Sequence, residues 1–269
     1  MKLVLSLLLL LSSLVFAENF SIKSWNVKKL SMNTLGKKQN PDFKNYINEE
    51  YDIVTLQELL DKDVMSKLSN RRYFVSKKLG KKYFEYVGFI VSDKYKNSDI
   101  KLIQYYDKKN SYYRDPVMLS IDNKIGVVSV HLLYGRKASR NATGKYDELT
   151  KREVRALSNM VKYFSKKSGI PESKIVIAGD FNLKPKKLKK IIPNKNILIT
   201  KKTTVTRSKN KIALNSYDHF IVDKGVESHS SYVDYSVLDK YFEGRGVESR
   251  KKMFKKFSDH YPIILKIDL

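Results

Sequence analysis

The sequence predicts an α/β or α+β fold, because short apolar runs rich in β-branched residues alternate with segments of helical periodicity. The run 174–179 has no polar interruption after its first residue, which is typical of a strand buried on both faces. We find no internal repeat and no linker rich in proline, glycine or serine. A single domain over residues 18–269 is therefore predicted.

The first seventeen residues are predicted to be a secretory signal peptide. Lys2 precedes an apolar run over 3–16, and Val15-Phe16-Ala17 fits a small-residue cleavage site. The run is too short for a good membrane span, and no later segment is apolar enough to cross a bilayer. We therefore expect secretion without stable membrane insertion after cleavage. An uncleaved anchor is the alternative, and retention in a periplasm or at a cell surface stays open.

The charge of the chain favours a polyanionic partner. Lysine and arginine total 53 against 28 acidic residues, a formal net charge of +25. Such a field attracts nucleic acid first and an anionic membrane surface second. The chain has no cysteine, which excludes disulfides and a lipid anchor on cysteine.

Two strands and a helix are predicted in the first sixty residues. A strand over 20–27 alternates apolar and polar residues and carries Asn26 at its end. A second strand over 51–58 ends in Glu58, which is costly to bury unless it binds a cation or a donor. Between them a helix begins at Asn40-Pro41-Asp42, with its apolar face formed by Phe43, Tyr46 and Ile47.

Lysine, arginine and tyrosine are interleaved with short apolar runs over 71–114. This pattern suits a surface that follows a nucleic-acid backbone, and an ordinary solvated face is the alternative. A strand over 83–89 is predicted to present Tyr83 and Glu85 on one side. Arg114-Asp115-Pro116 precedes another strand over 117–121.

The middle of the chain predicts a strand over 125–131 that ends in His131, followed by a helix that ends at Gly169. We expect the helix to begin at Thr150, which forms a capping box with Glu153. Its buried face is formed by Val154, Leu157, Val161 and Phe164. The lysine-rich segment 184–190 is predicted to be a loop.

Functional residue types follow the remaining strands. The strand 174–179 ends in Gly179, and Asp180 and Asn182 come directly after it. A rigid strand that ends in a carboxylate and an amide can hold both against a phosphate and a metal ion. Asp218 begins another predicted strand, and Asp259 and His260 precede the last one. His219 and His229 are expected to be structural or surface residues.

Taken in order, these segments resemble the motif set of the endonuclease/exonuclease/phosphatase superfamily, most closely its deoxyribonuclease I branch. The resemblance covers almost all of the chain after the signal peptide and implies a four-layer sandwich of two packed, mostly antiparallel β-sheets flanked by helices. Its motifs are Trp25-Asn26, Gln57-Glu58, Tyr83-Phe84-Glu85, Arg114-Asp115-Pro116, Val130-His131, Gly179-Asp180-Phe181-Asn182, Tyr217-Asp218 and Ser258-Asp259-His260-Tyr261-Pro262.

The resemblance implies hydrolysis of a phosphodiester by in-line attack of water. His260 is expected to be the general base, with Asp218 orienting its ring. His131 is expected to serve the leaving-group side or to hold the phosphate, with Glu85 as its carboxylate partner.

The resemblance also implies metal and substrate contacts. Glu58, helped by Asn26, is expected to bind Mg²⁺ or Mn²⁺, and a second metal or the phosphate oxygens would be held by Asp180, Asn182 and Asp259. For the substrate, Arg114 would clamp a phosphate, Tyr83 would pack against a sugar in the minor groove, and Lys28 would be a basic DNA contact.

The chain departs from the branch at several positions. Leu60 stands where an arginine would enter the minor groove, which puts double-strand preference in question. Thr203-Thr204-Val205-Thr206 resembles a structural Ca²⁺ loop, but Lys202 replaces the expected aspartate, so we expect that site to be lost. The loop before Tyr217 looks longer than usual, and the disulfide of animal members is missing.

The sequence therefore predicts a secreted, monomeric, metal-dependent endonuclease that cuts DNA with low sequence specificity and leaves 5′-phosphate ends. Action on RNA stays open. Two alternatives remain. One is a phosphodiesterase of the same fold that acts on another substrate, such as a sphingomyelinase, although the sequence shows no apolar hairpin with aromatic tips. The other is a DNA-binding or toxin-like module whose site has decayed, although each expected catalytic residue is present.

Overall fold

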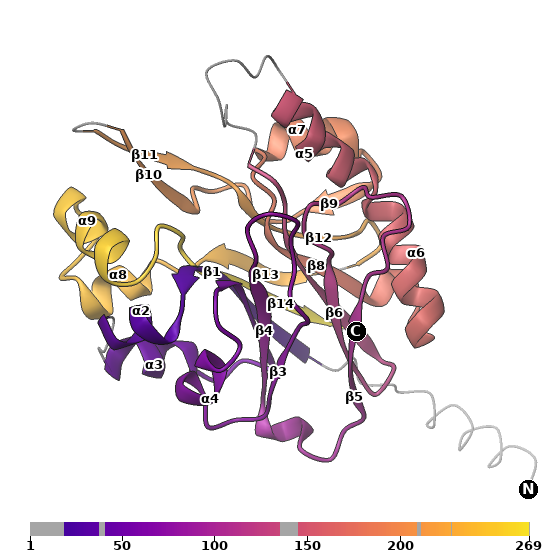
Figure 1. The fold of residues 1–269 in the computed structure, drawn as a ribbon, viewed down its shortest axis with the longest axis horizontal. Helices are drawn as coiled ribbons and strands as arrows, with labels where there is room; N and C mark the ends of the chain where they lie inside the picture. Colours follow the sequence, from indigo (N-terminus) through magenta and orange to yellow (C-terminus); the bar gives the residue numbers. More distant parts are fainter. Residues whose placement is uncertain (1–18, 38–40, 135–144, 209–210, 227, 269) are drawn as a thin grey trace, which may run out of the picture.

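Two six-stranded β-sheets dominate the computed structural model, which describes residues 19–37, 41–134, 145–208, 211–226 and 228–268 (Figure 1). The predicted signal peptide, residues 1–17, lies outside the described residues. The first sheet has the strand order β13 (Ser228–Val233), β14 (Ile263–Asp268), β1 (Asn19–Leu30), β2 (Ile53–Leu59), β4 (Tyr86–Val91) and β3 (Tyr73–Val75). The second has the order β5 (Ile100–Gln104), β6 (Val117–Ile121), β7 (Ile125–His131), β8 (Ile175–Asp180), β12 (Asp218–Asp223) and β9 (Lys195–Ile197).

Each sheet contains one parallel pair of strands, and its other pairs are antiparallel. β1 runs parallel to β2, and β7 runs parallel to β8. Parallel neighbours end at the same edge of a sheet, so Asn26 lies beside Gln57 in the first sheet and His131 beside Asp180 in the second. Asp218 of β12 faces Asp180 from the other side. This strand register brings the predicted site residues together.

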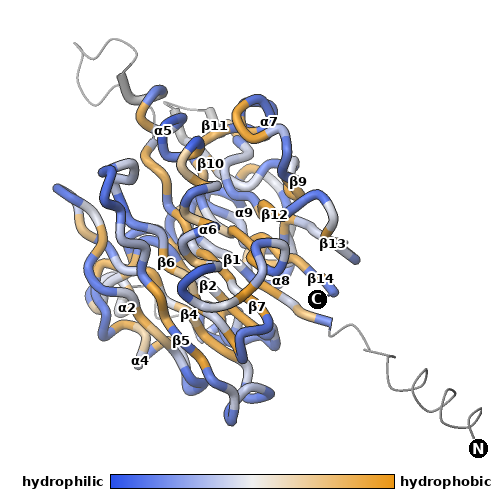
Figure 2. The backbone as a smooth tube through the Cα atoms, turned by 90° about the vertical axis from the view of Figure 1, so that its right-hand side faces the viewer, coloured by the Kyte–Doolittle hydropathy of each residue, from blue (hydrophilic) through white to orange (hydrophobic). Residues whose placement is uncertain are grey.

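The two sheets pack face to face, with β1 and β2 in contact with β7 and β8. Alternate residues of one strand therefore enter different cores. Val176 and Ala178 of β8 point into the core between the sheets, whereas Ile175 and Ile177 point into a second core on the outer face. The strand is buried along its whole length, as its uninterrupted apolar run predicts. Hydrophobic residues, drawn in orange in Figure 2, accordingly concentrate in the central strands.

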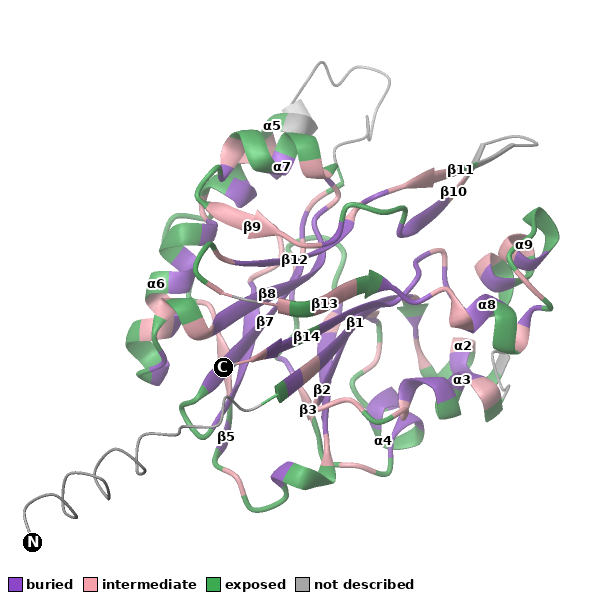
Figure 3. Cartoon of the chain, turned by 180° about the vertical axis from the view of Figure 1, so that it is seen from behind, coloured by how far each residue is buried: buried purple, intermediate pink, exposed green. Residues whose placement is uncertain are grey.

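Helices cover the outer faces of both sheets, with buried residues on one side and exposed residues on the other (Figure 3). The outer core of the second sheet is closed by apolar residues of α5 (Lys145–Arg155), α6 (Leu157–Ser168) and α7 (Pro185–Ile191). The first sheet packs against α2 (Met32–Lys37), α3 (Pro41–Ile47), α4 (Val64–Leu68), α8 (Ser236–Tyr241) and α9 (Val247–Lys256). Two short 3₁₀ helices, η1 (Asp93–Tyr95) and η2 (Glu172–Lys174), and the hairpin of β10 (Thr204–Ser208) and β11 (Lys211–Asn215) complete the described elements. The predicted four-layer sandwich is confirmed.

Most predicted elements are found close to their expected bounds, but the capping box at Thr150 is wrong. The helix already includes Lys145, and it breaks at Ala156 before α6 ends at Gly169, whose φ is +78°. The Thr150 hydroxyl donates instead to the carbonyl oxygen of Leu133 at 2.5 Å. The Glu153 carboxylate accepts from the backbone N–H groups of Tyr113 and Leu133, so tertiary contacts satisfy the side chains that would form the box.

Two further predictions are corrected by local geometry. The strand expected over 83–89 begins at Tyr86, and Glu85 forms a single bridge with Leu79, so Tyr83 and Glu85 do not share a strand face. The expected loop over 184–190 is largely the helix α7. Pro185 fits its first turn, and Leu188 is fully buried while lysines occupy the exposed positions.

Lys23 is a buried lysine of β1, remote from the predicted site residues. Its Nζ donates to the carbonyl oxygen of Tyr46 at 2.8 Å and to Glu49 Oε2 at 2.9 Å, and it lies 3.8 Å from the centre of the Tyr46 ring. Burial disfavours the charged amine, and this effect outweighs the attraction of Glu49. Burial therefore lowers the pKa of Lys23 to about 8.

This depressed pKa predicts a rise in stability with alkaline pH. Between pH 8 and 10.5 the unfolded lysine keeps a proton that the folded lysine has lost, so the free energy of unfolding should increase across this window, by about 3 kcal/mol from Lys23. Chemical denaturation of wild type and Lys23→Met at several pH values measures the difference. The exposed Lys266→Met variant should follow wild type, and a parallel curve for Lys23→Met would contradict the assignment.

Helices long and apolar enough to span a membrane are not found among the described residues.

Candidate active site

A cavity of about 340 Å³ opens where the carboxyl ends of the central strands of both sheets meet. Residues of β2, β7 and β8 line it, together with residues of the hairpin strand β10 and of helix α9. Six of the predicted catalytic and metal-binding residues line it, together with six other residues. The lining residues are Glu58, His131, Tyr134, Asp180, Asn182, Thr204, Val205, Thr206, Tyr217, Phe254, Asp259 and His260.

His260 is anchored to Asp218, the residue that the resemblance implies as its partner. Its Nδ1 lies 2.9 and 3.0 Å from the two carboxylate oxygens of Asp218, which fixes the proton on Nδ1 and turns Nε2 toward the cavity. Both side chains are buried. Burial would lower the pKa of His260, but the attraction of Asp218 and Asp180 outweighs burial and raises this pKa to about 10.

His131 is anchored to Glu85 in the same manner, from the opposite side of the cavity. Its Nδ1 lies 2.7 Å from Glu85 Oε1, and the second oxygen of Glu85 lies 2.8 Å from Nε of Arg114. Burial would lower the pKa of His131, but attraction to the Glu85 carboxylate raises it overall, against the repulsion of Arg114. The site therefore contains two histidines, each held by its own carboxylate.

Asp180 lies between these two histidines. Its Oδ2 is 3.8 Å from Nε2 of His131 and 3.7 Å from Nε2 of His260. Its Oδ1 accepts a hydrogen bond from the backbone N–H of Asn182 at 2.9 Å. Burial raises the pKa of Asp180 to about 6, and the neighbouring Asp218 adds to the shift. A positive charge beside Asp180 would therefore stabilise its ionised form.

The oxygen-rich donor set fits a hard divalent cation. Glu58 Oε1 and Asp180 Oδ2 both approach the amide nitrogen of Asn26, at 2.9 and 3.3 Å, so two carboxylates converge on one point. Asp180, Asp218 and His260 also form a buried cluster whose ligand atoms lie within 4.8 Å of one another. Since Asp218 is already bonded to His260 and Thr204, we regard Asp180 and Glu58 as the better ligands.

Asn26 and Asn182 lie at the site but use their amides within the protein. Asn26 turns its amide nitrogen to the carboxylates, and its Oδ1 accepts from the backbone N–H of Lys28 at 3.0 Å. The Asn182 amide nitrogen donates to the carbonyl oxygen of Leu132 at 2.8 Å. Asn26 would have to exchange its oxygen and nitrogen to become a metal ligand.

The three expected substrate contacts have different positions. Arg114 is turned to Glu85 and is largely buried, with 14% of its side chain exposed. Lys28 lies at the rim, where its Nζ is 3.8 Å from Asp259 Oδ2 and 3.3 Å from the centre of the Phe254 ring. Tyr83 does not line the cavity and is 69% exposed. Leu60, which stands where the resemblance implies an arginine, is exposed on the loop after β2.

Sequence reasoning missed the residues that support the His260–Asp218 pair. The Thr204 hydroxyl donates to Asp218 Oδ2 at 3.0 Å, and the Thr203 hydroxyl accepts from the backbone N–H of Asp218 at 3.0 Å. The indole N–H of Trp25 donates to the carbonyl oxygen of His260 at 2.8 Å. In the sequence the two threonines resemble only a lost Ca²⁺ loop. A local pattern does not reveal the hydrogen bond from Thr204 to Asp218, which is fourteen residues away.

The aromatic lining of the cavity was also missed. Tyr134, Tyr217 and Phe254 contribute to its wall, and the ring centres of Tyr134 and Tyr217 are 5.9 Å apart. No spacing in the sequence links these three residues, which come from three separate segments.

Gly179 positions Asp180 and tolerates no side chain. Its φ is +135°, and a Cβ there would lie 2.1 Å from the carbonyl oxygen of Val130 in the parallel neighbour β7. Gly179→Ala should lower the free energy of unfolding by at least about 2 kcal/mol, through strain and overpacking. Denaturant unfolding measures this change. The control Gly225→Ala, where a Cβ meets nothing within 4 Å, should stay within about 1 kcal/mol of wild type, and equal effects of both substitutions would contradict the prediction.

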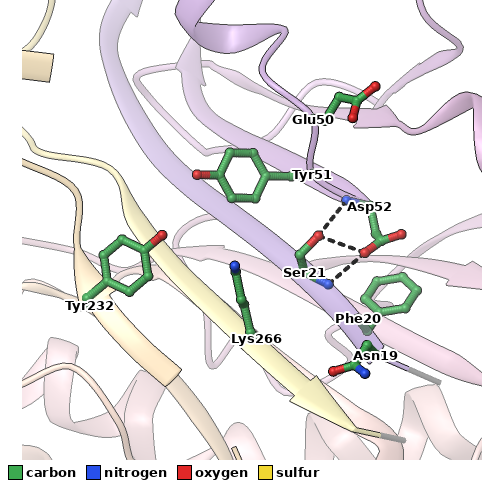
Figure 4. Close-up of a pocket in the computed structure, with 8 residues that line it drawn as sticks. All are labelled: Asn19, Phe20, Ser21, Glu50, Tyr51, Asp52, Tyr232 and Lys266. Carbon is green, nitrogen blue, oxygen red and sulfur yellow. Dashed lines mark hydrogen bonds between the residues drawn. The ribbon is translucent and has the colours of Figure 1, made fainter. Parts of the chain in front are cut away.

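A second cavity, of about 430 Å³, lies at the opposite end of β1 and β2 (Figure 4). Asp52 accepts hydrogen bonds there from the backbone N–H and the hydroxyl of Ser21, and Tyr51, Tyr232 and Lys266 extend around the opening. This cavity is larger than the first, but the residues that line it include no histidine and none of the predicted site residues. The smaller cavity is therefore the candidate active site.

The fold is that of solved endonuclease/exonuclease/phosphatase structures. Solved structures with this fold include TDP2 from D. rerio, with 14% identity, coverage of 94% of this chain and 100% of the other, and a TM-score of 0.59. They also include the 3′-5′ exonuclease NExo from Neisseria meningitidis, at 15% identity, 93% and 100% coverage and a TM-score of 0.59. An endonuclease/exonuclease/phosphatase family protein from Bacteroides thetaiotaomicron has 11% identity, 93% and 95% coverage and a TM-score of 0.58. No family model and no curated protein sequence matches the chain. The fold that the sequence resemblance implies is confirmed.

Proposed function

We propose that this protein is a secreted, metal-dependent endonuclease that hydrolyses DNA phosphodiester bonds with low sequence specificity. The observation that carries the proposal is the pair of carboxylate-anchored histidines, whose Nε2 atoms lie 3.7 and 3.8 Å from the same oxygen of one buried aspartate. A phosphodiester needs a proton acceptor on the side of the attacking water and a donor or clamp on the other side. The net charge of +25 supports a polyanionic substrate, and the D. rerio TDP2 structure contains a single-strand DNA product.

In the proposed mechanism His260 takes the proton of the attacking water at Nε2. Asp218 holds the ring through Nδ1, stabilises the imidazolium that forms, and is itself positioned by Thr204. His131, held by Glu85, contacts the phosphoryl oxygens or the leaving oxygen from the opposite side. Breaking the bond to the 3′ oxygen leaves the phosphate on the 5′ end.

Asp180 and Glu58 are the proposed ligands of Mg²⁺ or Mn²⁺, with Asn26 joining after rotation of its amide. A cation bound there would stabilise the charge on the phosphoryl oxygens, and its charge beside Asp180 would offset part of the attraction that raises the pKa of His260. Asn182 and Asp259 are proposed to hold phosphate oxygens or a second cation. Lys28 and Arg114 supply positive charge around the phosphate. Tyr83 is an exposed residue two positions before Glu85.

Incubation of the purified protein with supercoiled plasmid in Mg²⁺ or Mn²⁺ tests the proposal. We expect nicked circles that do not form in EDTA, and ends that accept a ligase without prior phosphorylation. Plasmid binding without cutting would instead support a decayed binding module. If plasmid is neither bound nor cut, lipid phosphodiesters become the next substrate to test.

A further inference from the structure

The cavity that holds the catalytic side chains also has an aromatic wall. Tyr134, Tyr217 and Phe254 line it together with His131 and His260. We infer that this wall binds the face of an unpaired nucleobase beside the phosphate that is cut, and that single-stranded nucleic acid is therefore the preferred substrate. The inference rests on the proposed function and specifies its substrate.

The three rings are attached to the segments that hold the catalytic groups. Tyr134 follows His131 by three residues, and Tyr217 directly precedes Asp218. Phe254 lies on α9, and its carbonyl oxygen accepts a hydrogen bond from Lys28 at 3.2 Å. A base that stacks on this wall therefore lies in the same cavity as the reacting phosphate.

The rings are accessible from solvent. Tyr134 is 37% exposed, and Tyr217 and Phe254 are partly exposed. The ring planes of Tyr134 and Tyr217 are inclined at 64°, an edge-to-face contact, and both residues line the cavity. The cavity volume of about 340 Å³ is within the range of sites that enclose small ligands.

Stacking separates unpaired from paired substrates. Stacking of one base on an aromatic side chain is worth about 1–3 kcal/mol, and it is independent of sequence because every base has a π-face. In a duplex these faces are covered by neighbouring bases, and exposing one costs a few kcal/mol. A single strand gains the stacking energy without this cost, so the wall discriminates by secondary structure and keeps sequence specificity low.

A second group of exposed rings adjoins the His131 side of the site. Tyr83 and Phe84 are 69% and 46% exposed and directly precede Glu85, whose carboxylate binds His131. Lys78 Nζ lies 4.0 Å from the centre of the Phe84 ring. Exposed rings beside lysines are typical of grooves that follow a single strand. A strand of several nucleotides could thus contact rings on both sides of the reacting phosphate.

The test compares a labelled oligonucleotide of mixed sequence with its own duplex, as initial rates in Mn²⁺. We expect the single strand to be cut at least about tenfold faster, which corresponds to one stacked base. Tyr134→Leu should lower kcat/KM on the single strand about tenfold and bring the ratio of the two rates near one, whereas Tyr134→Phe should retain the preference. Tyr232, which is 38% exposed at the other cavity, gives the matched control Tyr232→Leu, with unchanged rates expected.

Failure of this inference differs from failure of the proposed function. Duplex cut as fast as single strand, with both dependent on metal, would overturn the inference and leave the nuclease in place. If neither DNA nor bis(p-nitrophenyl) phosphate is hydrolysed, the proposed function fails, and fluorescence anisotropy in EDTA then decides the inference. Tighter binding of the single strand that Tyr134→Leu abolishes would support the aromatic wall, and equal affinity for both forms would reject it.

Discussion

Replacement of His260 by alanine should lower kcat for plasmid nicking by about 10²–10⁴-fold, the range that removal of a general base produces. The physical reason is the orientation of the ring, since Asp218 holds Nδ1 and leaves Nε2 as the basic atom toward the cavity. The site retains Glu58, Asp180 and His131 in this variant. Metal and substrate binding should therefore survive, and KM should change much less than kcat.

The nicking rate under single-hit conditions measures this effect, and His229→Ala is the matched control. His229 is a surface histidine of β13, with 53% of its side chain exposed, and it pairs with Asp268 away from the cavity. Its removal should leave the nicking rate unchanged. A His260→Ala protein that keeps a tenth or more of the wild-type rate would remove His260 from the role of general base.

Asp180→Asn should abolish the stabilisation of the folded protein by Mn²⁺. For wild type, a metal concentration one hundred times Kd should raise the free energy of unfolding by about 2.7 kcal/mol. The asparagine keeps the size of the side chain and can still accept the hydrogen bond of Asn182 through Oδ1, but it lacks the charge. Thermal or denaturant unfolding in Mn²⁺ and in EDTA measures the loss without reference to activity.

The same variant should lose one part of the pH dependence in EDTA. Because the pKa of Asp180 is raised from its ordinary value to about 6, the folded protein holds a proton that the unfolded chain has released between pH 4 and 6. Stability of the metal-free wild type should therefore fall as pH rises through this window, and Asp180→Asn should lack this fall. The control is Asp223→Asn, at the opposite end of β12 from Asp218. This variant should keep both the Mn²⁺ effect and the pH effect. A full Mn²⁺ effect in Asp180→Asn would place the cation elsewhere.

The strands that carry the chemistry were predictable from the sequence because each is a local pattern. The runs over 117–121 and 125–131 are found with those bounds, and Asp218 begins its strand as expected. Helix α3 begins at Pro41 and buries Phe43, Tyr46 and Ile47. Hydrophobic burial and proline geometry act over a few residues, so a single sequence reveals them.

The local sequence was misleading where distant partners decide the structure. Thr150 and Glu153 look like a capping box, yet the backbone of Leu133 binds both side chains. The lysines of 184–190 suggest a loop, yet burial of Leu188 stabilises a helix. In each case a contact that the sequence does not announce outweighs a local preference of about 1 kcal/mol.

The sequence by itself determined the types of the site residues and the strand ends on which they lie, since apolar periodicity and motif order are written in the chain. The family resemblance also implies that Asp218 pairs with His260 and Glu85 with His131, but only the tertiary structure decided how these two pairs meet. The parallel register of β7 and β8 puts His131 beside Asp180, and sheet packing brings His260 to 3.7 Å from the same carboxylate. Three other features also depend on segments far apart in the chain. They are the orientation of the Asn26 amide, the hydrogen bond from Thr204 to Asp218, and the aromatic wall of Tyr134, Tyr217 and Phe254. Their positions follow from the packing of two sheets, which no local pattern encodes.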